Sequence, residues 1–359
     1  GLPFDGGQPI VFNNHFYFFA DNGTAGIELW KSDGTEAGTQ LFMDIITGSN
    51  SSAYKTVGIT TDNYFLFTTN IPNSFGYNLW KSDGTVAGTQ VLRTLTSAFS
   101  WEPTSFEPVR LNNEVYFVAY DESSGKELWK TNGTVNGTIL VKDIYPGTND
   151  SNINHLTSIG NILYFAARDS SESYSNKPWR TDGTANGTFM LKNVVLGPST
   201  ATEISFVELQ GNVFFPAGDE DLHGNELYKT QGTVESTHLV ADVFHRYSSY
   251  PDHFIKLNNK LIFTAYNGMS ERIPFVTDGT ISGTKPIKED YSYYSIPTYS
   301  DDIVPKFTKA GNNIFFRAFK SGAGFELFKT DGTSNGTVLV KDIAQGSQYG
   351  VNEYTIFME

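Results

Sequence analysis

The sequence predicts an all-β fold, a seven-bladed β-propeller built from four-stranded antiparallel blades. Three observations predict it: a twelve-residue motif occurs seven times, its copies are about 50 residues apart, and short apolar runs bounded by Gly and Asn turns lie between them. The first glycines of the copies are 50, 49, 50, 49, 47 and 53 residues apart, at Gly34, Gly84, Gly133, Gly183, Gly232, Gly279 and Gly332. We therefore expect residues 1–359 to form one closed domain, without helices, although the length would allow two or three domains.

The motif reads E-L-W-K-T-N-G-T-V-N-G-T in its third copy, residues 127–138. The Asp or Asn before the first Gly predicts a hairpin between the third and fourth strands of a blade. A large side chain follows the Leu position, and we expect it to fill the wedge between neighbouring blades; it is Trp30, Trp80, Trp129, Trp179, Tyr228, Phe275 or Phe328. The alternative, a Ca²⁺ ion at each Asp-Gly turn, is disfavoured because Gln231 replaces the acidic residue in the fifth copy.

The third repeat shows the order of strands that we expect in every blade. A short strand over 108–111, a turn at Asn112-Asn113 and a strand over 114–119 precede a polar loop over 120–126 and the motif itself. The same turn is expected at positions 13–14, 258–259 and 312–313, and a Gly-Asn turn at 160–161 and 211–212. Residues 354–359 resemble an additional first strand, which either helps to close the ring or begins a region missing from the chain.

The connections between strands divide the predicted propeller into two faces. The short turns and the Gly-Thr hairpins are nearly identical from repeat to repeat and lie on one face. The loops between the second and third strands, and the long crossovers between blades, lie on the other face and differ in every repeat. Because varied loops on a rigid scaffold usually carry function, we expect the ligand to bind there.

Three crossovers on this varied face are rich in aromatic side chains. Aromatic rings beside carboxylates are typical of sugar recognition, because the rings stack on apolar sugar faces while polar groups bind hydroxyls. The alternative is that these aromatics only pack the crossovers onto the blades. The predicted ligand-binding residues are Trp101, Tyr247, Tyr291, Tyr293, Tyr294, Asp301 and Asp302.

Metal binding has one weak candidate in the sequence. The acidic run Asp219-Glu220-Asp221 concentrates the oxygen ligands that Ca²⁺ prefers, although a solvated charged loop is the favoured interpretation. The six histidines show no zinc-binding spacing. Apart from this Ca²⁺ candidate, no cofactor is expected.

Composition excludes several classes of partner. The net charge of −14 opposes binding to nucleic acid and to an anionic membrane surface. The chain has no cysteine, which excludes thiol catalysis, and no apolar run approaches the 18 residues of a membrane span. It begins with Gly1 and shows no signal-peptide pattern, so we expect a mature or trimmed product.

The motif resembles the ELWxxDGT repeat found in secreted and surface proteins of bacteria, especially Bacteroidetes. The first, third and seventh copies match almost completely, over 28–35, 127–134 and 326–333, whereas the sixth, over 273–280, departs most. The resemblance implies an exported or cell-surface propeller, often associated with a type IX secretion sorting domain. It therefore suggests the secretion or surface-anchoring machinery as a partner, and it implies no reaction.

Two functions remain open at this point. The first, which we expect, is a binding or adhesion module that is not an enzyme and recognises a glycan or a surface protein. The second is an extracellular polysaccharide-acting enzyme, a glycosidase or lyase, on a propeller scaffold. No pair of carboxylates stands out as an acid–base couple, and the seven arginines occupy no shared position of the repeat.

Overall fold

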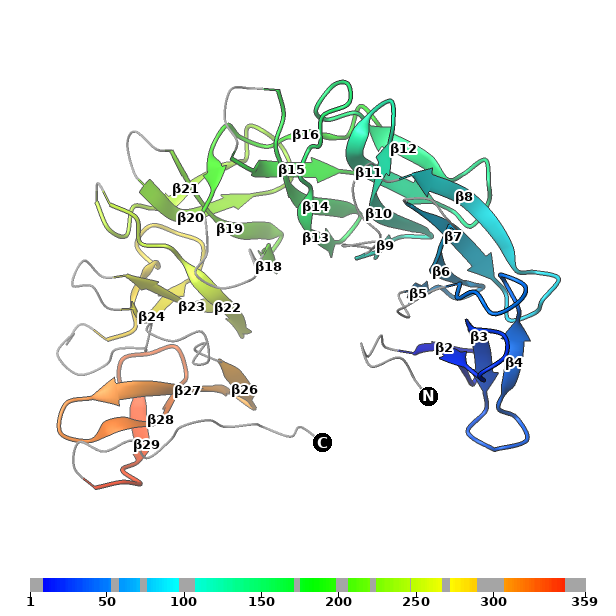
Figure 1. The fold of residues 1–359 in the computed structure, drawn as a ribbon. Coiled ribbons are helices and arrows are strands. Elements are labelled where there is room, and N and C mark those ends of the chain that lie inside the picture. The colour runs from blue at the N-terminus through cyan, green and yellow to red at the C-terminus, as the bar shows by residue number, and fades with distance from the viewer. Residues whose placement is uncertain are drawn as a thin grey trace. The chain divides into compact units, whose positions relative to one another are not determined.

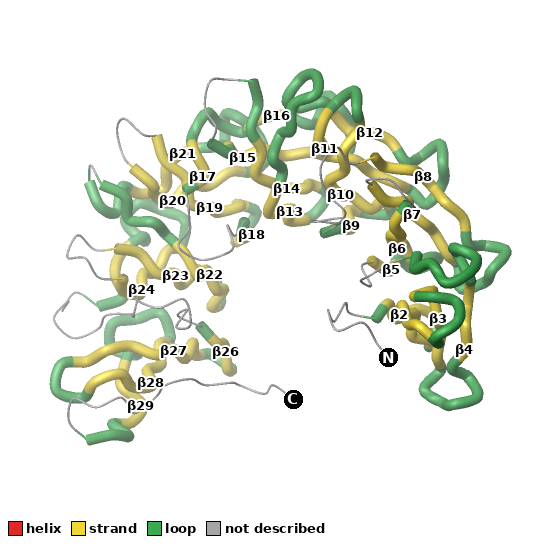
Figure 2. The backbone as a smooth tube through the Cα atoms, in the orientation of Figure 1, coloured by secondary structure: helices red, strands yellow, loops and turns green. Residues whose placement is uncertain are grey.

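The computed structural model describes residues 9–52, 58–71, 76–96, 107–170, 175–197, 206–219, 224–245, 247–266, 272–288 and 307–345. These residues form seven antiparallel sheets, one for each repeat, and none of them is helical (Figures 1 and 2). The predicted all-β repeat architecture, with four antiparallel strands in each repeat, is therefore confirmed for the described part of the chain. The six C-terminal residues predicted as an extra strand lie outside it.

The first three sheets consist of consecutive strands, paired in chain order as hairpins. They are β1 (Ile10–Phe12), β2 (His15–Asp21), β3 (Ile27–Ser32) and β4 (Gln40–Met43); β5 (Gly58–Thr60), β6 (Phe65–Asn70), β7 (Gly76–Ser82) and β8 (Gln90–Thr96); and β9 (Val109–Leu111), β10 (Glu114–Asp121), β11 (Gly125–Thr131) and β12 (Ile139–Lys142).

The remaining four sheets follow the same order, and the fifth gains one strand because both β17 and β18 pair with β19. They are β13 (Asn154–Ile159), β14 (Ile162–Ala167), β15 (Lys177–Thr181) and β16 (Phe189–Met190); β17 (Val195–Leu196), β18 (Val207–Leu209), β19 (Asn212–Asp219), β20 (Gly224–Thr230) and β21 (His238–Ala241); β22 (Asp252–Leu257), β23 (Lys260–Tyr266), β24 (Arg272–Thr277) and β25 (Lys285–Pro286); and β26 (Thr308–Ala310), β27 (Asn313–Lys320), β28 (Gly324–Thr330) and β29 (Val338–Lys341).

The chain divides into two compact units. The first comprises residues 1–163, 167–174 and 181–188, and the second comprises residues 164–166, 175–180 and 189–359. In both units each sheet has two ends. We call the end with the Gly-Thr connection the hairpin end, and the opposite end, with the loop between the second and third strands and the crossover, the loop end.

The turns between first and second strands are mostly where the sequence places them. Asn13, Asn112 and Asn258 have φ angles of 48°, 55° and 53°, in the left-handed region that Asn tolerates. Two predicted turns are shifted by one residue, to 210–211 and 311–312, because Gln210 and Gly311 take the left-handed conformation there.

The predicted polar loop at 120–126 is wrong for most of its length. β10 continues to Asp121 and β11 begins at Gly125, so only three residues connect them. The Asp121 carboxylate accepts hydrogen bonds from the Ser123 backbone N–H and hydroxyl, and the Ser124 N–H bonds to the Asp121 carbonyl. This tight turn lets the two strands stay paired to their ends.

The Gly-Thr connection is a seven-residue turn held by its own side chains, as the third repeat shows. Asn132 Oδ1 accepts hydrogen bonds from the backbone N–H and the hydroxyl of Thr134, at 3.1 and 2.7 Å. The Thr134 hydroxyl in turn accepts the Gly137 N–H at 3.0 Å, and Thr138 Oγ1 donates to the Thr134 carbonyl at 2.8 Å. These oxygens bond within the turn, which favours the structural role over the alternative of one Ca²⁺ ion per hairpin.

The second glycine of the motif is required because the acidic side chain occupies the space above it. A Cβ built on the second glycine of any copy that has one would lie 1.9–2.1 Å from the preceding Asp or Asn Oδ1. The fifth copy has Gln231 and Ser236 at these two positions, and the Ser236 hydroxyl accepts the Thr233 N–H and hydroxyl at 3.2 and 3.1 Å. One serine thus replaces both the carboxylate and the glycine.

The motif aromatics pack against the preceding sheet. Trp129 is 3% exposed and belongs to a cluster with Tyr64, Leu79 and Leu92 of the second repeat, and the Arg93 guanidinium lies 4.2 Å from its ring centroid. Phe275 of the sixth repeat packs in the same way on side chains of the fifth. The expectation that this position fills the space between neighbouring sheets is confirmed at these interfaces.

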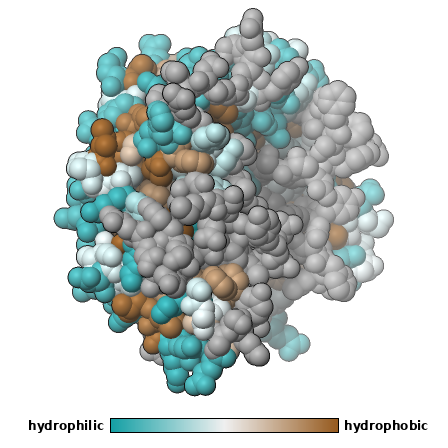
Figure 3. Space-filling model, turned by 90° about the vertical axis from the view of Figure 1, so that its left-hand side faces the viewer, coloured by the Kyte–Doolittle hydropathy of each residue, from teal (hydrophilic) through white to brown (hydrophobic). Residues whose placement is uncertain are grey.

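The surface is mixed in character. On the face drawn in Figure 3, hydrophobic residues are scattered among hydrophilic ones. Four of the exposed apolar side chains, Val86, Val135, Val234 and Ile281, occupy the same position at the tip of a Gly-Thr turn. No helix of the described chain is long and apolar enough to cross a membrane.

Candidate functional site at the loop end of the sixth sheet

The crossover between β21 and β22 is the described segment that carries a predicted ligand residue, Tyr247. It is held to β20 by the motif glutamate of the fifth repeat, Glu226, which is completely buried. The Glu226 carboxylate accepts hydrogen bonds from Val243 N–H at 2.9 Å, Ser249 N–H at 3.0 Å and the Ser249 hydroxyl at 2.7 Å. The Ser249 carbonyl then accepts the Tyr266 N–H at 2.8 Å, so the crossover is joined to β23 as well.

The same arrangement recurs wherever the glutamate is followed by a suitable serine. Glu127 accepts hydrogen bonds from Ile144 N–H and Tyr145 N–H, both at 3.1 Å, and from the Ser151 hydroxyl at 2.8 Å. Burial raises the pKa of Glu127 and of Glu226 to about 7, although these hydrogen bonds oppose the shift. Sequence reasoning missed this role; the signal was a serine 23 or 24 residues after the glutamate.

An exposed aromatic platform lies on this anchored crossover. The rings of Phe244 and Tyr247 stack with centroids 5.0 Å apart and an interplanar angle of 26°. Tyr247 is 65% exposed, whereas Phe244 is half-buried. Beside them, Asp242 Oδ2 and His245 Nδ1 are 2.8 Å apart. The crossover therefore presents one aromatic face to solvent together with polar groups.

Beneath the crossover, three charged or titratable residues gather at the start of β22 and β24. Arg272 is 1% exposed; its Nη1 donates to Thr264 Oγ1 at 2.8 Å and its Nη2 to the Tyr250 carbonyl at 2.7 Å. His253 Nδ1 lies 3.2 Å from Thr264 Oγ1 and 3.7 Å from Asp252 Oδ2. Burial lowers the pKa of His253; Asp252 opposes this shift and Arg272 adds to it.

Three atoms of this group have no hydrogen-bond partner among the described residues: Arg272 Nε, His253 Nε2 and Asp252 Oδ2. Unpaired buried polar atoms are unfavourable, and they are frequent where a site binds another molecule. Such atoms occur in every repeat of the described chain, so the loop end of the sixth sheet is the candidate region because three of them gather beside the exposed Phe244–Tyr247 pair.

The backbone beside this group is strained in a way that the repeat explains. Tyr250 and His253 have φ angles of 45° and 55°, which are unfavourable for residues with a side chain. Asn152 and His155, at the corresponding positions of the fourth repeat, have φ angles of 50° and 55°. Because the conformation recurs, it belongs to the entry of the first strand and is not evidence of function.

Most of the predicted site lies beyond what the structure describes. Of the seven predicted ligand residues, Tyr247 is the described one; Trp101, Tyr291, Tyr293, Tyr294, Asp301 and Asp302 lie outside the described residues, and their role stays a prediction. Of the Ca²⁺ candidate, Asp219 is the last residue of β19, while Glu220 and Asp221 also lie outside. In the described ranges, no group of three His, Asp or Glu side chains is arranged to hold a metal ion.

Comparisons with known proteins find distant structural likenesses to peptidases and hydrolases. No family model matches the chain, and no curated protein matches it, so the resemblance to the ELWxxDGT repeat stays a prediction. A structure of puromycin hydrolase is similar with a TM-score of 0.42 at 12% identity, over 96% of this chain and 55% of that chain. Oligopeptidase B from Leishmania major is similar with a TM-score of 0.43 at 10% identity, over 96% and 49%. A prolyl endopeptidase gives 0.42 at 10%, over 92% and 49%.

These findings correct one expectation. The prediction that the chain is not an enzyme is contradicted, because the solved structures that it resembles are hydrolases and peptidases. The chain spans about half the length of those proteins, and a likeness at this identity assigns no reaction to it.

Proposed function

We propose that the chain is an extracellular or cell-surface module that recognises a glycan or a surface protein through the loop ends of its sheets. The observation that carries this proposal is the stacked Phe244–Tyr247 pair, exposed on a crossover that the buried Glu226 holds in place. A pre-ordered aromatic ring binds a sugar face without the entropic loss of ordering a flexible loop. The exposed imidazole of His245, which Asp242 Oδ2 contacts at 2.8 Å, can bind a hydroxyl group beside the ring.

The proposal includes the setting suggested by the repeat. The seven sheets close into a propeller, and the protein is exported by a bacterium, with its secretion or surface-anchoring machinery as a further partner. Nucleic acid is not a partner, since the net charge is −14. Negative-stain electron microscopy of the purified chain tests the closure: a ring with seven blades supports it, and an open or elongated particle contradicts it.

A glycan array followed by calorimetric titration with the best ligand tests the recognition. Replacing Tyr247 by Ala removes the exposed ring, and we expect at least about tenfold weaker binding, as for the loss of one aromatic platform. Phe16→Ala is the matched control, because Phe16 is an exposed aromatic, 44% accessible, on β2. Unchanged affinity in Tyr247→Ala, with a folded protein, contradicts the proposed platform.

A polysaccharide-acting enzyme is the second candidate, and one specific observation favours it. Asp252 and His253 lie 3.7 Å apart with unpaired buried atoms at the same loop end as the platform. Release of reducing ends from a polysaccharide panel, lost in Asp252→Asn and retained in Tyr247→Ala at saturating substrate, would establish this alternative over simple binding.

A further inference from the structure

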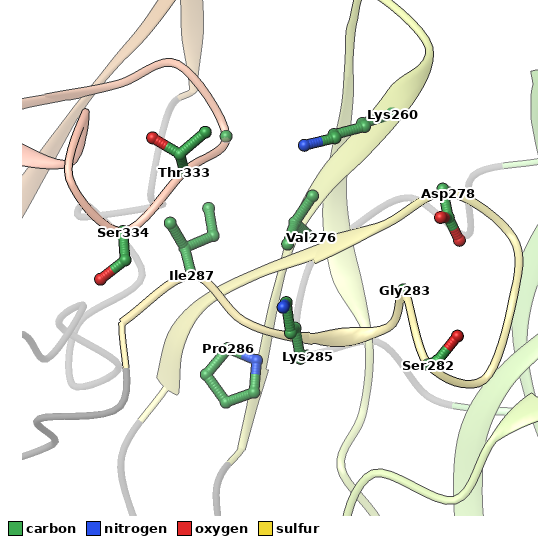
Figure 4. A pocket seen from close by; sticks show the side chains of 11 residues that line it. Lys260, Val276, Asp278, Ser282, Gly283, Lys285, Pro286, Ile287, Thr333 and Ser334 are labelled. Carbon is green, nitrogen blue, oxygen red and sulfur yellow. The ribbon is translucent and has the colours of Figure 1, made fainter.

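A pocket of about 530 Å³ opens at the hairpin end of the second unit, between the sixth and seventh repeats. Figure 4 shows its lining: Lys260, Val276 and Lys285 come from the sixth repeat, and Thr333 and Ser334 come from the hairpin of the seventh. Its volume is within the range of sites that bind small molecules. It lies at the end of the sheet opposite to the proposed recognition site and is independent of it.

The pocket exists because an aromatic residue that fills this place in other repeats is missing here. In the first, third and fifth repeats, Tyr17, Tyr116 and Phe214 lie against the hairpin glycine of the next repeat: a Cβ built on that glycine would be 2.1–3.0 Å from the ring or hydroxyl. The sixth repeat has Ile262 at this position, and a Cβ on Gly332 would meet it at 3.5 Å. The smaller side chain leaves space beside the seventh hairpin.

A second side chain that crosses this interface elsewhere is also absent. The residue after the motif aromatic is Lys or Arg in six copies. In two of them it reaches the next hairpin: Lys229 Nζ donates to the Gly279 carbonyl at 2.7 Å, and Arg180 Nη1 to the Gly232 carbonyl at 3.3 Å. The sixth copy has Val276 instead, which can neither donate nor fill the space. Two independent substitutions thus open one volume.

The same repeat brings two cations to the opened space. Lys260 stands where the third repeat has Glu114, and Lys285 stands where it has Ile139. Neither ammonium lies within ion-pair distance of a described carboxylate, and Figure 4 shows the Lys260 amine directed towards the hairpin of Thr333. Side-chain hydrogen bonds within their own turns lower the pKa of the Asp278 and Asp331 carboxyl groups, and Lys260 is nevertheless close enough to both to add to that shift. The one carboxylate of the lining, Asp278, has its Oδ1 engaged by the Thr280 N–H and hydroxyl at 2.9 and 2.7 Å.

We propose that this pocket binds a small organic anion of monosaccharide size, carrying a carboxylate or a phosphate. Lys260 and Lys285 hold the anionic group, and the hydroxyls of Thr333 and Ser334 accept or donate hydrogen bonds to the ligand's hydroxyl groups. The cavity holds two ammonium groups and one carboxylate, Asp278, whose Oδ1 is already bonded within its own turn. The second lysine, Lys285, therefore favours an anion over a neutral sugar.

Isothermal titration with glucuronate, glucose 6-phosphate, glucose and inorganic phosphate tests this proposal. We expect saturable binding of glucuronate or glucose 6-phosphate, weaker at high salt, and none of glucose. Binding of glucuronate alone assigns the carboxylate, and binding of glucose 6-phosphate alone assigns the phosphate. Inorganic phosphate binding as tightly as glucose 6-phosphate overturns the assignment to an organic ligand, and so does the absence of binding by both organic anions.

Three variants locate the binding. Lys260→Met is expected to weaken it at least about tenfold, a loss typical of one charge-assisted hydrogen bond. Ile262→Tyr restores the aromatic residue of the first and third repeats and adds no charge; it is expected to abolish binding while the melting temperature stays equal or rises. Lys309→Met, an exposed lysine on β26 outside the pocket, is the control. Affinity that is unchanged in both Lys260→Met and Ile262→Tyr overturns the proposal.

Discussion

The third and sixth repeats have the same strand order but differ in the side-chain contacts that their motif residues make. In the third repeat, Glu127 binds its crossover, and Lys130 pairs with Glu114 at 3.0 Å. In the sixth repeat, Ile273, Val276 and Lys260 stand in place of Glu127, Lys130 and Glu114, so both contacts are absent together. The motif is therefore a set of coupled contacts. Where a repeat loses the set, it gains space and unpaired charge.

The largest expected effect concerns the aromatic that both repeats retain. Trp129→Ala removes a side chain that is 3% exposed from the cluster between the second and third repeats. We expect the free energy of unfolding to fall by roughly 3–5 kcal/mol, measured by urea denaturation. Phe16→Ala, on an exposed surface, is the control. A loss below about 1 kcal/mol would show that this position does not hold neighbouring sheets together.

The first glycine of the hairpin allows a second comparison, because its surroundings differ between two interfaces. Gly133 of the third repeat lies against the second repeat, and Gly332 of the seventh lies against the sixth. Gly133 and Gly332 both have a φ angle of 81°. A Cβ on Gly133 would lie 2.7 Å from the Tyr64 ring, whereas a Cβ on Gly332 meets nothing closer than 3.5 Å. Both Ala variants lose about 1–2 kcal/mol through the backbone conformation, and Gly133→Ala loses about 1–3 kcal/mol more through the clash.

Denaturation of the two alanine variants side by side measures this difference. A β-branched residue such as Val at position 133 should be worse than Ala, since it is less compatible with a positive φ. Equal losses in Gly133→Ala and Gly332→Ala would mean that Tyr64 moves aside without penalty, and that the sixth interface is not unusually open.

A smaller effect, dependent on pH, is expected from the buried glutamates. The pKa of Glu127 is raised by burial to about 7, from an ordinary value of 4.5. The folded state therefore binds the proton more tightly than the unfolded state. The stabilisation that follows is complete below pH 4.5 and is lost as the pH rises through 7. Urea midpoints of the wild type and Glu127→Gln between pH 4 and 8 test this: the variant should lose less stability over that range. An identical pH dependence would contradict it.

Sequence reasoning predicted the periodic parts of this molecule and missed the contacts that join distant segments. The turn at Asn112 and the burial of Trp129 follow from local rules, since Asn tolerates a positive φ and aromatics fill interfaces. The hydrogen bond between Glu226 and Ser249 could not be predicted in the same way, because it depends on the crossover folding back onto β20. The pocket beside Lys260 was missed because it depends on two positions at once. Ile262 replaces an aromatic residue and Val276 replaces a lysine or arginine, and both are evident only when the repeats are aligned with one another.

Among the sites, Tyr247 was predicted from its type and its place on the varied face, and the structure shows it exposed. Arg272 was overlooked because arginines share no position of the repeat. Its burial depends on Thr264 and the Tyr250 carbonyl, which are 8 and 22 residues away. Contacts of that kind depend on both strand pairing and crossover conformation. The sequence pattern predicts strand pairing better than it predicts the conformation of a crossover.

The smallest expected effect tests whether the motif is truly a coupled set, using the one hairpin that is built differently. In the fifth repeat, the Ser236 hydroxyl accepts the two hydrogen bonds that the Asp or Asn side chain accepts in other repeats, and Ser236 also occupies the position of the second glycine. Ser236→Gly removes its hydrogen bonds and should lower the free energy of unfolding by about 1 kcal/mol.

Gln231→Asp alone should also destabilise the protein, because in the other repeats the acidic side chain occupies the space that the Ser236 Cβ needs. The double variant restores the arrangement of the third repeat and should recover most of both losses, giving a coupling energy of about 1 kcal/mol or more in a double-mutant cycle. Additive losses would show that the two positions act independently, and that the fifth hairpin owes its stability to its strands alone.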